Sequence, residues 1–319
     1  MTKRVAAIDC GTNSIRLLIS DVHPRSGRTE DVVREMRIVR LGEGVDATGR
    51  LARAALERTF AACLEYQDLI ERHSGGIPIP LRFVATSATR DAENRQEFVD
   101  GVRGILGVEP YVATGEEEAR FSFTGATAEL PHDRHQAPYL VVDIGGGSTE
   151  FVLGDGGERG VIAARSVDMG CVRMYERHLK STGVATEDQV KAARADIEKL
   201  IDRAAEAVPL EEARTLVGLA GTVTTLGAVA LDLPEYDSER IHLSHIPLGR
   251  VRDMTTRLLG MTPEERKAIP AMHPGRADVI GAGALVLLAI MERVAPTLVT
   301  PEVVVSERDI LDGIAASIA

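Results

Sequence analysis

The 319-residue sequence is poor in aromatic side chains, which make up 3% of it, and it contains no Trp. Apolar residues still account for 44% of the chain, so its cores must be built from aliphatic side chains. Cysteine is also scarce. Cys10, Cys63 and Cys171 are odd in number and show neither a C-x-x-C pattern nor metal-ligand spacing, which argues against a disulfide framework and indicates a reducing compartment.

Long apolar runs and an evident basic face are missing as well. No run approaches the roughly 18 residues of a membrane-spanning helix, and the opening MTKRVAAIDCG reads as a strand and a turn instead of a signal peptide. We therefore expect a cytoplasmic protein without a membrane partner. The net charge of −11 argues against a nucleic-acid partner. To bind a polyanionic ligand, the protein would need a local basic patch or metal ions that offset the electrostatic repulsion from its net negative charge.

The chain length suits two domains. The polar, proline-bounded stretch at residues 131–138 is the expected junction, which gives domains of residues 1–130 and 131–319. Apolar runs predict strands and helical spacing predicts helices. The predicted strands are residues 5–8, 15–22, 139–142 and 150–153, and the predicted helices are residues 52–73, 91–106, 117–128, 186–207 and 276–294.

The same hexapeptide pattern occurs twice. Asp-Cys-Gly-Thr-Asn-Ser at residues 9–14 and Asp-Ile-Gly-Gly-Gly-Ser at residues 143–148 share D-x-G-x-x-S, and a strand is predicted before and after each copy. This internal repeat predicts two related domains, each opening with a β-hairpin whose tip carries Asp, Gly and Ser.

A glycine-rich turn after a strand often binds phosphate. Here both turns lead back into a strand, and the chain has neither G-K-[ST] nor G-x-G-x-x-G, which excludes the P-loop and Rossmann classes. What remains is a hairpin tip whose backbone N–H groups and hydroxyls point at an anion. One such turn could be only a turn, but two matching copies favour phosphate binding.

Carboxylates accompany both turns. Asp9 and Asp143 begin them, and carboxylate oxygens near phosphate suit Mg²⁺, although each Asp could instead cap its own turn. Residues 115–120 read Gly-Glu-Glu-Glu-Ala-Arg, where one glutamate could activate water or the run could only complement a helix dipole. Glu150 lies just beyond the second turn and could be an ordinary exposed glutamate.

Several motifs in this order resemble the Ppx/GppA phosphatase family. They are IDCGTNSIRLLI, TSATRDAEN, GEEEARFSFTGA, VVDIGGGSTEFVLG, MGCVR, GLAGTVTTL and HPGRADVIGAGALVL, and they span nearly the whole chain. The resemblance implies an α/β fold of two actin-like (ribonuclease H-like) domains from the sugar kinase, heat-shock chaperone and actin superfamily, with the active site in the interdomain cleft. It also implies metal-dependent hydrolysis of phosphoanhydride bonds.

The resemblance assigns roles residue by residue. Glu118 matches the catalytic base, and Glu150 matches the second essential carboxylate, with Asp143 beside it at the metal. Asp9, Asp143 and Glu150 are therefore the candidate ligands of Mg²⁺ or Mn²⁺. The two phosphate loops and a further phosphate-contacting segment correspond to Gly11, Thr12, Asn13, Ser14, Gly145, Gly146, Gly147, Ser148, Thr86 and Arg90.

The chain resembles the short, two-domain form of the family, an exopolyphosphatase that releases terminal phosphate from inorganic polyphosphate, and we expect a homodimer. Hydrolysis of guanosine pentaphosphate to the tetraphosphate uses the same chemistry and stays open. A small-molecule kinase and a non-catalytic nucleotide-binding actin-like protein are weaker alternatives. The segment VSERDILDGIA near the C-terminus departs from the family's usual pattern, so the role of residues 306–313 is open.

Overall fold

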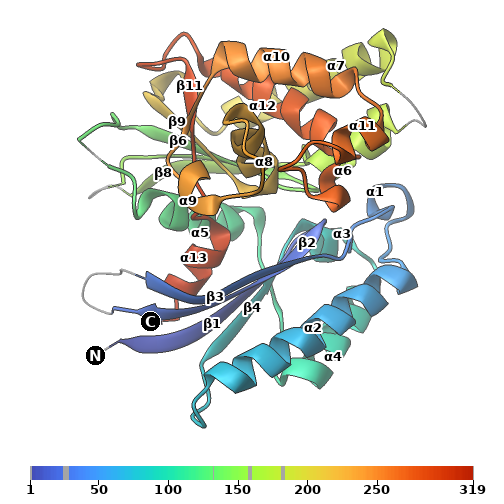
Figure 1. Ribbon diagram of the computed structural model, residues 1–319, viewed down its shortest axis with the longest axis vertical. Coiled ribbons are helices and arrows are strands. Elements are labelled where there is room, and N and C mark those ends of the chain that lie inside the picture. The colour runs from blue at the N-terminus through green and yellow to red at the C-terminus, as the bar shows by residue number, and fades with distance from the viewer. Residues whose placement is uncertain (1, 24–28, 132, 157–159, 181–183, 319) are drawn as a thin grey trace. The chain divides into compact units, whose positions relative to one another are not determined.

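The computed structural model describes residues 2–23, 29–131, 133–156, 160–180 and 184–318. The chain forms two compact units, one of residues 1–128 and 310–319 and the other of residues 129–309. It therefore passes from one unit to the other twice. Each unit has its own sheet (Figure 1). Each also has its own hydrophobic core.

The sheet of the first unit has the strand order β3-β2-β1-β4-β5. β1 pairs antiparallel with β2 and parallel with β4, while β3 pairs antiparallel with β2 and β5 pairs parallel with β4. The strands are β1 (Lys3–Cys10), β2 (Ser14–Val22), β3 (Thr29–Ile38), β4 (Leu81–Ala85) and β5 (Tyr111–Val112). The helices are α1 (Val45–Thr48), α2 (Arg53–His73), α3 (Ser87–Asp91), α4 (Arg95–Leu106), α5 (Gly115–Thr127) and α13 (Ile310–Ala316).

Alternate residues of β1 face two different helix layers. Ala6, Ile8 and Cys10 belong to the core that includes apolar residues of α2 and α4, whereas Val5 and Ala7 pack in a second cluster with residues of α13. Successive side chains of a strand point to opposite faces, so the continuous apolar run of β1 reflects a sheet covered on both sides.

The sheet of the second unit has the order β10-β11-β9-β6-β7-β8. Its strands are β6 (Tyr139–Ile144), β7 (Thr149–Gly154), β8 (Val161–Val167), β9 (Thr215–Leu219), β10 (His245–Pro247) and β11 (Glu302–Val305). Its α-helices are α6 (Cys171–Met174), α7 (Glu187–Ala205), α8 (Ala220–Ala230), α9 (Ser238–Ile241), α10 (Leu248–Leu259), α11 (Pro263–Lys267) and α12 (Ile280–Val294). Short helical segments are η1, a π-helix (Tyr175–Leu179), and the 3₁₀ turns η2 (Leu210–Glu212) and η3 (Pro274–Arg276).

The helix α12 is apolar on nearly all sides and is almost entirely buried in the core of the second unit. Across the described part of the chain, no helix combines the length and hydropathy that a bilayer span requires.

The two sheets repeat one topology. The order β8-β7-β6-β9-β11 matches β3-β2-β1-β4-β5 strand for strand, with the same antiparallel and parallel pairings, and β10 is an additional antiparallel strand. The repeat inferred from D-x-G-x-x-S is therefore confirmed at the level of whole sheets. The expected α/β fold class, with two domains of related topology, is confirmed as well.

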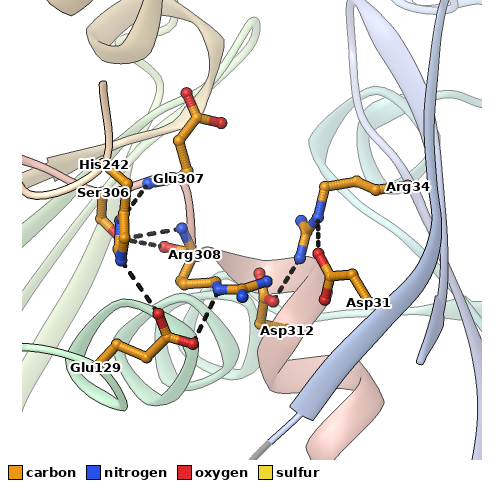
Figure 2. A network of polar contacts seen from close by, with 8 residues as sticks. All are labelled: Asp31, Arg34, Glu129, His242, Ser306, Glu307, Arg308 and Asp312. Carbon is orange, nitrogen blue, oxygen red and sulfur yellow. Dashed lines mark hydrogen bonds and ion pairs between the residues drawn. The ribbon is translucent and has the colours of Figure 1, made fainter. Parts of the chain in front are cut away.

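Residues 306–313, whose role the sequence leaves open, connect the second unit to the first (Figure 2). At its beginning, Ser306 Oγ donates to the Arg308 carbonyl at 2.6 Å and accepts from the Arg308 N–H at 3.1 Å. Glu129, at the other end of this unit, accepts from Arg308 Nε at 3.2 Å and is hydrogen-bonded to His242 at 3.2 Å. The two chain ends of the second unit are thus joined by an ion pair.

The helix α13 belongs to the first unit, whereas the sequence analysis placed residues 310–319 in the second domain. Its apolar residues pack on β1 and β2, and Asp312 accepts a 2.5 Å hydrogen bond from Arg34 of β3 (Figure 2). Gly313 lies so close to α5 that a Cβ there would clash with the carbonyl of Phe121. These long-range contacts have no signature in the local sequence, which explains the difference.

Candidate active site

The first loop is the tip of the β1–β2 hairpin. The Gly11 N–H donates to the Ser14 carbonyl at 2.9 Å, which closes the turn, and the Thr12 and Ser87 hydroxyls are 3.0 Å apart and buried. The carbonyls of Thr12 and Asn13 accept from backbone N–H groups of residues 39–42, which follow β3. The loop is therefore held on one side by the segment after the third strand of its sheet.

Asp9 at the end of β1 lies opposite Arg16 of β2. Its Oδ2 accepts from Arg16 Nη2 at 2.6 Å and from Nε at 3.1 Å, and Asp9 is 5% exposed. A buried carboxylate requires such pairing, because its desolvation would otherwise favour the neutral form. The carboxylate of the first repeat thus has an internal cation beside it.

Thr86, Arg90 and Glu118 come together in the first unit with the first loop. The Thr86 N–H donates to the Cys10 carbonyl at 3.2 Å, which joins the end of β4 to the start of the loop. Arg90 of α3 donates from Nη1 to the Ala113 carbonyl at 2.9 Å and to Glu118 Oε2 at 3.2 Å. The predicted base and the predicted phosphate-contacting arginine therefore form one ion pair.

The glutamates of α5 have different environments. Glu117 is the N3 residue of a capping box with Thr114, and it accepts a short hydrogen bond from the Tyr111 hydroxyl. These bonds, with that of Tyr111 the larger cause, lower the pKa of Glu117. Glu116 is exposed, whereas Glu118 is only 7% exposed and pairs with Arg90. The capping box accounts for Glu117, and Glu118 is the glutamate of this run that pairs with Arg90.

The second loop repeats the closure of the first. The Gly145 N–H donates to the Ser148 carbonyl at 3.1 Å. The carbonyls of Gly145, Gly146 and Gly147 all accept hydrogen bonds from the segment at residues 169–173, which includes the MGCVR motif. In both units the loop is backed by the chain that follows the third strand, so the repeat extends beyond the hairpin.

A row of oxygen-bearing side chains crosses the strands beside this loop. Asp143 of β6 lies opposite Glu150 of β7, which lies opposite Ser166 of β8. Asp143 and Glu150 are 6% and 1% exposed, and Ser166 Oγ donates to Glu150 Oε1 at 2.7 Å. Two carboxylates directly opposite each other repel unless a cation or a proton intervenes. This donor set fits Mg²⁺ or Mn²⁺.

Within the described ranges, no cluster of three or more His, Cys, Asp or Glu side chains is arranged to hold a metal ion. Mg²⁺ is commonly held by one or two carboxylates, water and substrate phosphates instead of a complete protein cage. The opposed carboxylates of Asp143 and Glu150 fit that pattern, whereas Asp9 Oδ2 is engaged by Arg16.

The three cysteines are buried and unpaired with one another. Desolvation raises the pKa of Cys10 well above its ordinary value, and it also raises the pKa of Cys63, to about 12, and that of Cys171. Cys10, within the first loop motif, is completely buried and packs as a small apolar side chain in the core of the first unit.

Sequence reasoning missed Arg16 and Ser166. Arg16 is seven residues after Asp9, as Glu150 is seven residues after Asp143, so it occupies the matching position of the repeat. Aligning the two copies past their shared serine would have revealed this exchange of charge. Ser166 had no such signal, because its place opposite Glu150 depends on the register of β8.

The model of the Ppx/GppA phosphatase family matches residues 18–317 of the chain. The chain is 49% identical to exopolyphosphatase 2 of Mycobacterium tuberculosis over 99% of its own length and 98% of that protein. It is 31% identical to a guanosine-5'-triphosphate,3'-diphosphate pyrophosphatase of Aeromonas hydrophila over 90% of its length and 54% of that protein.

Among solved structures, the crystal structure of an exopolyphosphatase-like protein superposes with a TM-score of 0.93 at 43% identity, covering 99% of this chain and 97% of the other. The family model and this near-complete superposition agree with the duplicated hairpins described above. The chain belongs to the Ppx/GppA phosphatase family.

Proposed function

We propose that this protein is an exopolyphosphatase, which hydrolyses the terminal phosphoanhydride bond of inorganic polyphosphate and releases phosphate. The observation that carries the proposal is the full-length similarity, at 49% identity, to a protein named exopolyphosphatase 2. The duplicated glycine loops, the partly buried Glu118–Arg90 pair and the Asp143–Glu150 carboxylates supply the groups that this chemistry needs.

In the proposed reaction, the two loops each bind phosphoryl oxygens of the substrate. Their residues are Gly11, Thr12, Asn13 and Ser14 in the first loop and Gly145, Gly146, Gly147 and Ser148 in the second. Backbone N–H groups directed at the phosphoryl oxygens stabilise charge without reorganising during the reaction. Thr86 and Arg90 contribute a hydroxyl and a guanidinium to the same anion.

Glu118 is the proposed general base. It accepts a proton from a water molecule, whose oxygen forms a bond to the terminal phosphorus while the bridging P–O bond breaks. The shortened chain leaves with the electron pair of that bond. Arg90 keeps one Glu118 oxygen in place, at 3.2 Å.

Asp143 and Glu150 are the residues that would hold Mg²⁺ or Mn²⁺, and Ser166 fixes one Glu150 oxygen. When bound, such an ion supplies positive charge that offsets the charge of the phosphates. Asp9 would join this set only by giving up part of its pairing with Arg16. We therefore assign the metal mainly to the second unit.

The proposal is tested by phosphate release from polyphosphate, guanosine pentaphosphate and ATP under identical conditions. We expect polyphosphate to give the highest kcat/KM. A higher value for guanosine pentaphosphate would assign the protein to the other activity of the family. Turnover of ATP only in the presence of an acceptor molecule would instead indicate a kinase.

We also propose a homodimer that works in the cytoplasm. Three free, buried cysteines are compatible with a reducing compartment. Light scattering on the purified protein tests the dimer, and fractionation of the cells that produce the protein tests its location.

A further inference from the structure

The second loop combines three consecutive glycines, which leaves its backbone conformation poorly specified by its own residues. The inference concerns what specifies it, and it rests on the proposed function of this loop in binding phosphate. We infer that residues 169–173 are the positioning element of the loop and that Arg173 is a positioning residue for catalysis.

The hydrogen bonds of this segment fix three successive peptide groups. The Gly145 carbonyl accepts from the Cys171 N–H at 2.9 Å, and the Gly146 carbonyl accepts from the N–H groups of Val172 and Arg173 at 2.9 and 3.1 Å. The Gly147 carbonyl accepts from the Gly170 N–H at 3.2 Å. All three carbonyls are thereby directed toward residues 170–173.

The orientation of the neighbouring N–H groups follows from the planarity of the peptide. In a trans peptide the C=O of one residue and the N–H of the next point in opposite directions. Anchoring the carbonyls of residues 145–147 therefore turns the N–H groups of Gly146, Gly147 and Ser148 away from the anchoring segment. Successive N–H groups on one side of a turn form an anion-binding concavity. The segment keeps repulsive carbonyl oxygens away from the phosphate.

Arg173 adds a side-chain clamp to the backbone bonds. Its Nε donates to the Gly147 carbonyl at 2.7 Å, and its side chain is 11% exposed and lies 3.7 Å from Asp168. Gly147 is the last glycine before Ser148, so this bond holds the peptide group whose N–H belongs to Ser148. A charged donor strengthens such a bond relative to a neutral one.

Gly170 permits the close approach that these bonds require. A Cβ at this position would clash with the carbonyl carbon and oxygen of Gly146 and with the N atom of Gly147, all of which are backbone atoms. The backbone of the loop would have to move to accept any larger residue. The MGCVR motif therefore has a physical reason for its glycine and for its arginine.

The first unit contains an equivalent but smaller set of hydrogen bonds behind its loop. The Asn13 carbonyl accepts from the N–H groups of Val39 and Arg40 at 3.0 and 2.9 Å, and the Thr12 carbonyl accepts from that of Gly42 at 2.9 Å. A Cβ at Gly42 would clash with the Thr12 side chain, as one at Gly170 would clash with Gly146. The recurrence of the contact after the third strand of each sheet argues that it serves the loops.

The experiment replaces Arg173 by Met, which keeps the apolar stem and removes the donor. The matched control is Arg177→Met, which removes an arginine of η1 that lies 3.6 Å from Asp196. Gly170→Ala moves the loop by a second route, and Gly249→Ala, where a Cβ meets open space, is its control. The measurements are kcat and KM on polyphosphate, inhibition by inorganic phosphate, and the amide NMR signals of residues 146–148 during a titration with inorganic phosphate.

We expect Arg173→Met to weaken phosphate inhibition and to lower kcat/KM by about tenfold each, with a melting temperature close to that of the wild type. Small displacements of a binding group have effects of this size or larger. Gly170→Ala should act in the same direction, and both controls should match the wild type. Unchanged inhibition and unchanged phosphate-induced amide shifts in both Arg173→Met and Gly170→Ala would overturn the inference.

The amide titration also separates this inference from the proposed function. A wild-type protein that does not hydrolyse polyphosphate would contradict the proposed function alone. Amide signals of Gly146, Gly147 and Ser148 that respond to inorganic phosphate would still support the positioning role if Arg173→Met diminished the response. Amide signals that do not respond in the wild type would overturn it.

Discussion

Replacing Glu118 by Gln tests the assignment of the general base most directly. The substitution preserves size, and the amide oxygen can still accept the hydrogen bond that Arg90 donates at 3.2 Å. Only the ability to take a proton from water is lost. A general base contributes about 10²–10⁴-fold to rate, so we expect kcat on polyphosphate to fall by at least about 10²-fold while substrate affinity changes little.

Glu117→Gln is the matched control, one residue earlier on α5. Glutamine is also found at the N3 position of capping boxes; its amide oxygen can accept from the Thr114 N–H while its NH₂ group donates to the Tyr111 oxygen. We expect activity within about twofold of the wild type and a change in the free energy of unfolding within about 0.5 kcal/mol. Steady-state phosphate release and thermal melting measure both variants. The reasoning is refuted if Glu117→Gln loses activity and Glu118→Gln keeps it.

Three further outcomes are expected. A chelator should abolish hydrolysis and added Mg²⁺ or Mn²⁺ should restore it, because carboxylates and polyphosphate form a donor set for a hard cation; full activity in excess chelator would contradict this. The hydrogen bond from His242 lowers the pKa of Glu129. The contact between these two side chains therefore contributes to stability at neutral pH, and this contribution is lost as the pH falls through the lowered pKa. Glu129→Gln should therefore lower the free energy of unfolding by about 0.5–1 kcal/mol at neutral pH and by less in acid. Denaturant unfolding curves at several pH values measure this difference. A decrease that does not depend on pH would count against the ion pair. Gly313→Ala should destabilise the protein by about 1–3 kcal/mol because its Cβ would meet the Phe121 carbonyl, whereas Gly249→Ala should not; equal melting temperatures would count against this packing.

The sequence predicts the long, regular elements well. The helix expected at residues 52–73 is found at Arg53–His73, and the helix expected at residues 186–207 is found at Glu187–Ala205, where Thr186 and Gln189 form a capping box. The helix expected from residue 117 begins at Gly115, because Thr114 and Glu117 form a capping box that was overlooked. The helix expected from residue 276 begins at Ile280, because residues 274–276 form a separate 3₁₀ turn that begins at Pro274.

The strand β3 was not predicted at all. Its sequence, TEDVVREMRI, is rich in charge and lacks an apolar run, which is typical of a strand at the edge of a sheet. In the site, too, local motifs could be predicted from the sequence, whereas contacts between distant positions could not. The loops, Glu118 and the Asp143–Glu150 pair were identified because each lies in a local motif. The hydrogen bonds between the second loop and residues 169–173 join positions more than 20 residues apart along the chain, so only the structure reveals them.

The two copies of the hairpin differ in the residue that lies opposite the aspartate at the strand end. In the first, the residue opposite Asp9 is Arg16, and the two charges compensate each other; in the second, the residue opposite Asp143 is Glu150. Directly opposed like charges destabilise a sheet by up to about 1 kcal/mol, so we expect a bound cation to stabilise the second hairpin more than the first.

The difference gives a test in which activity plays no part. Glu150→Gln removes one negative charge, and its amide oxygen can still accept from Ser166. We expect Mg²⁺ to raise the melting temperature of the wild type but to have little effect on this variant. In chelator, the variant should melt at the same temperature as the wild type or higher, since the repulsion with Asp143 is gone. An equal response of both proteins to Mg²⁺ would place the metal elsewhere and would remove the reason for the exchange of Arg16 for Glu150 between the repeats.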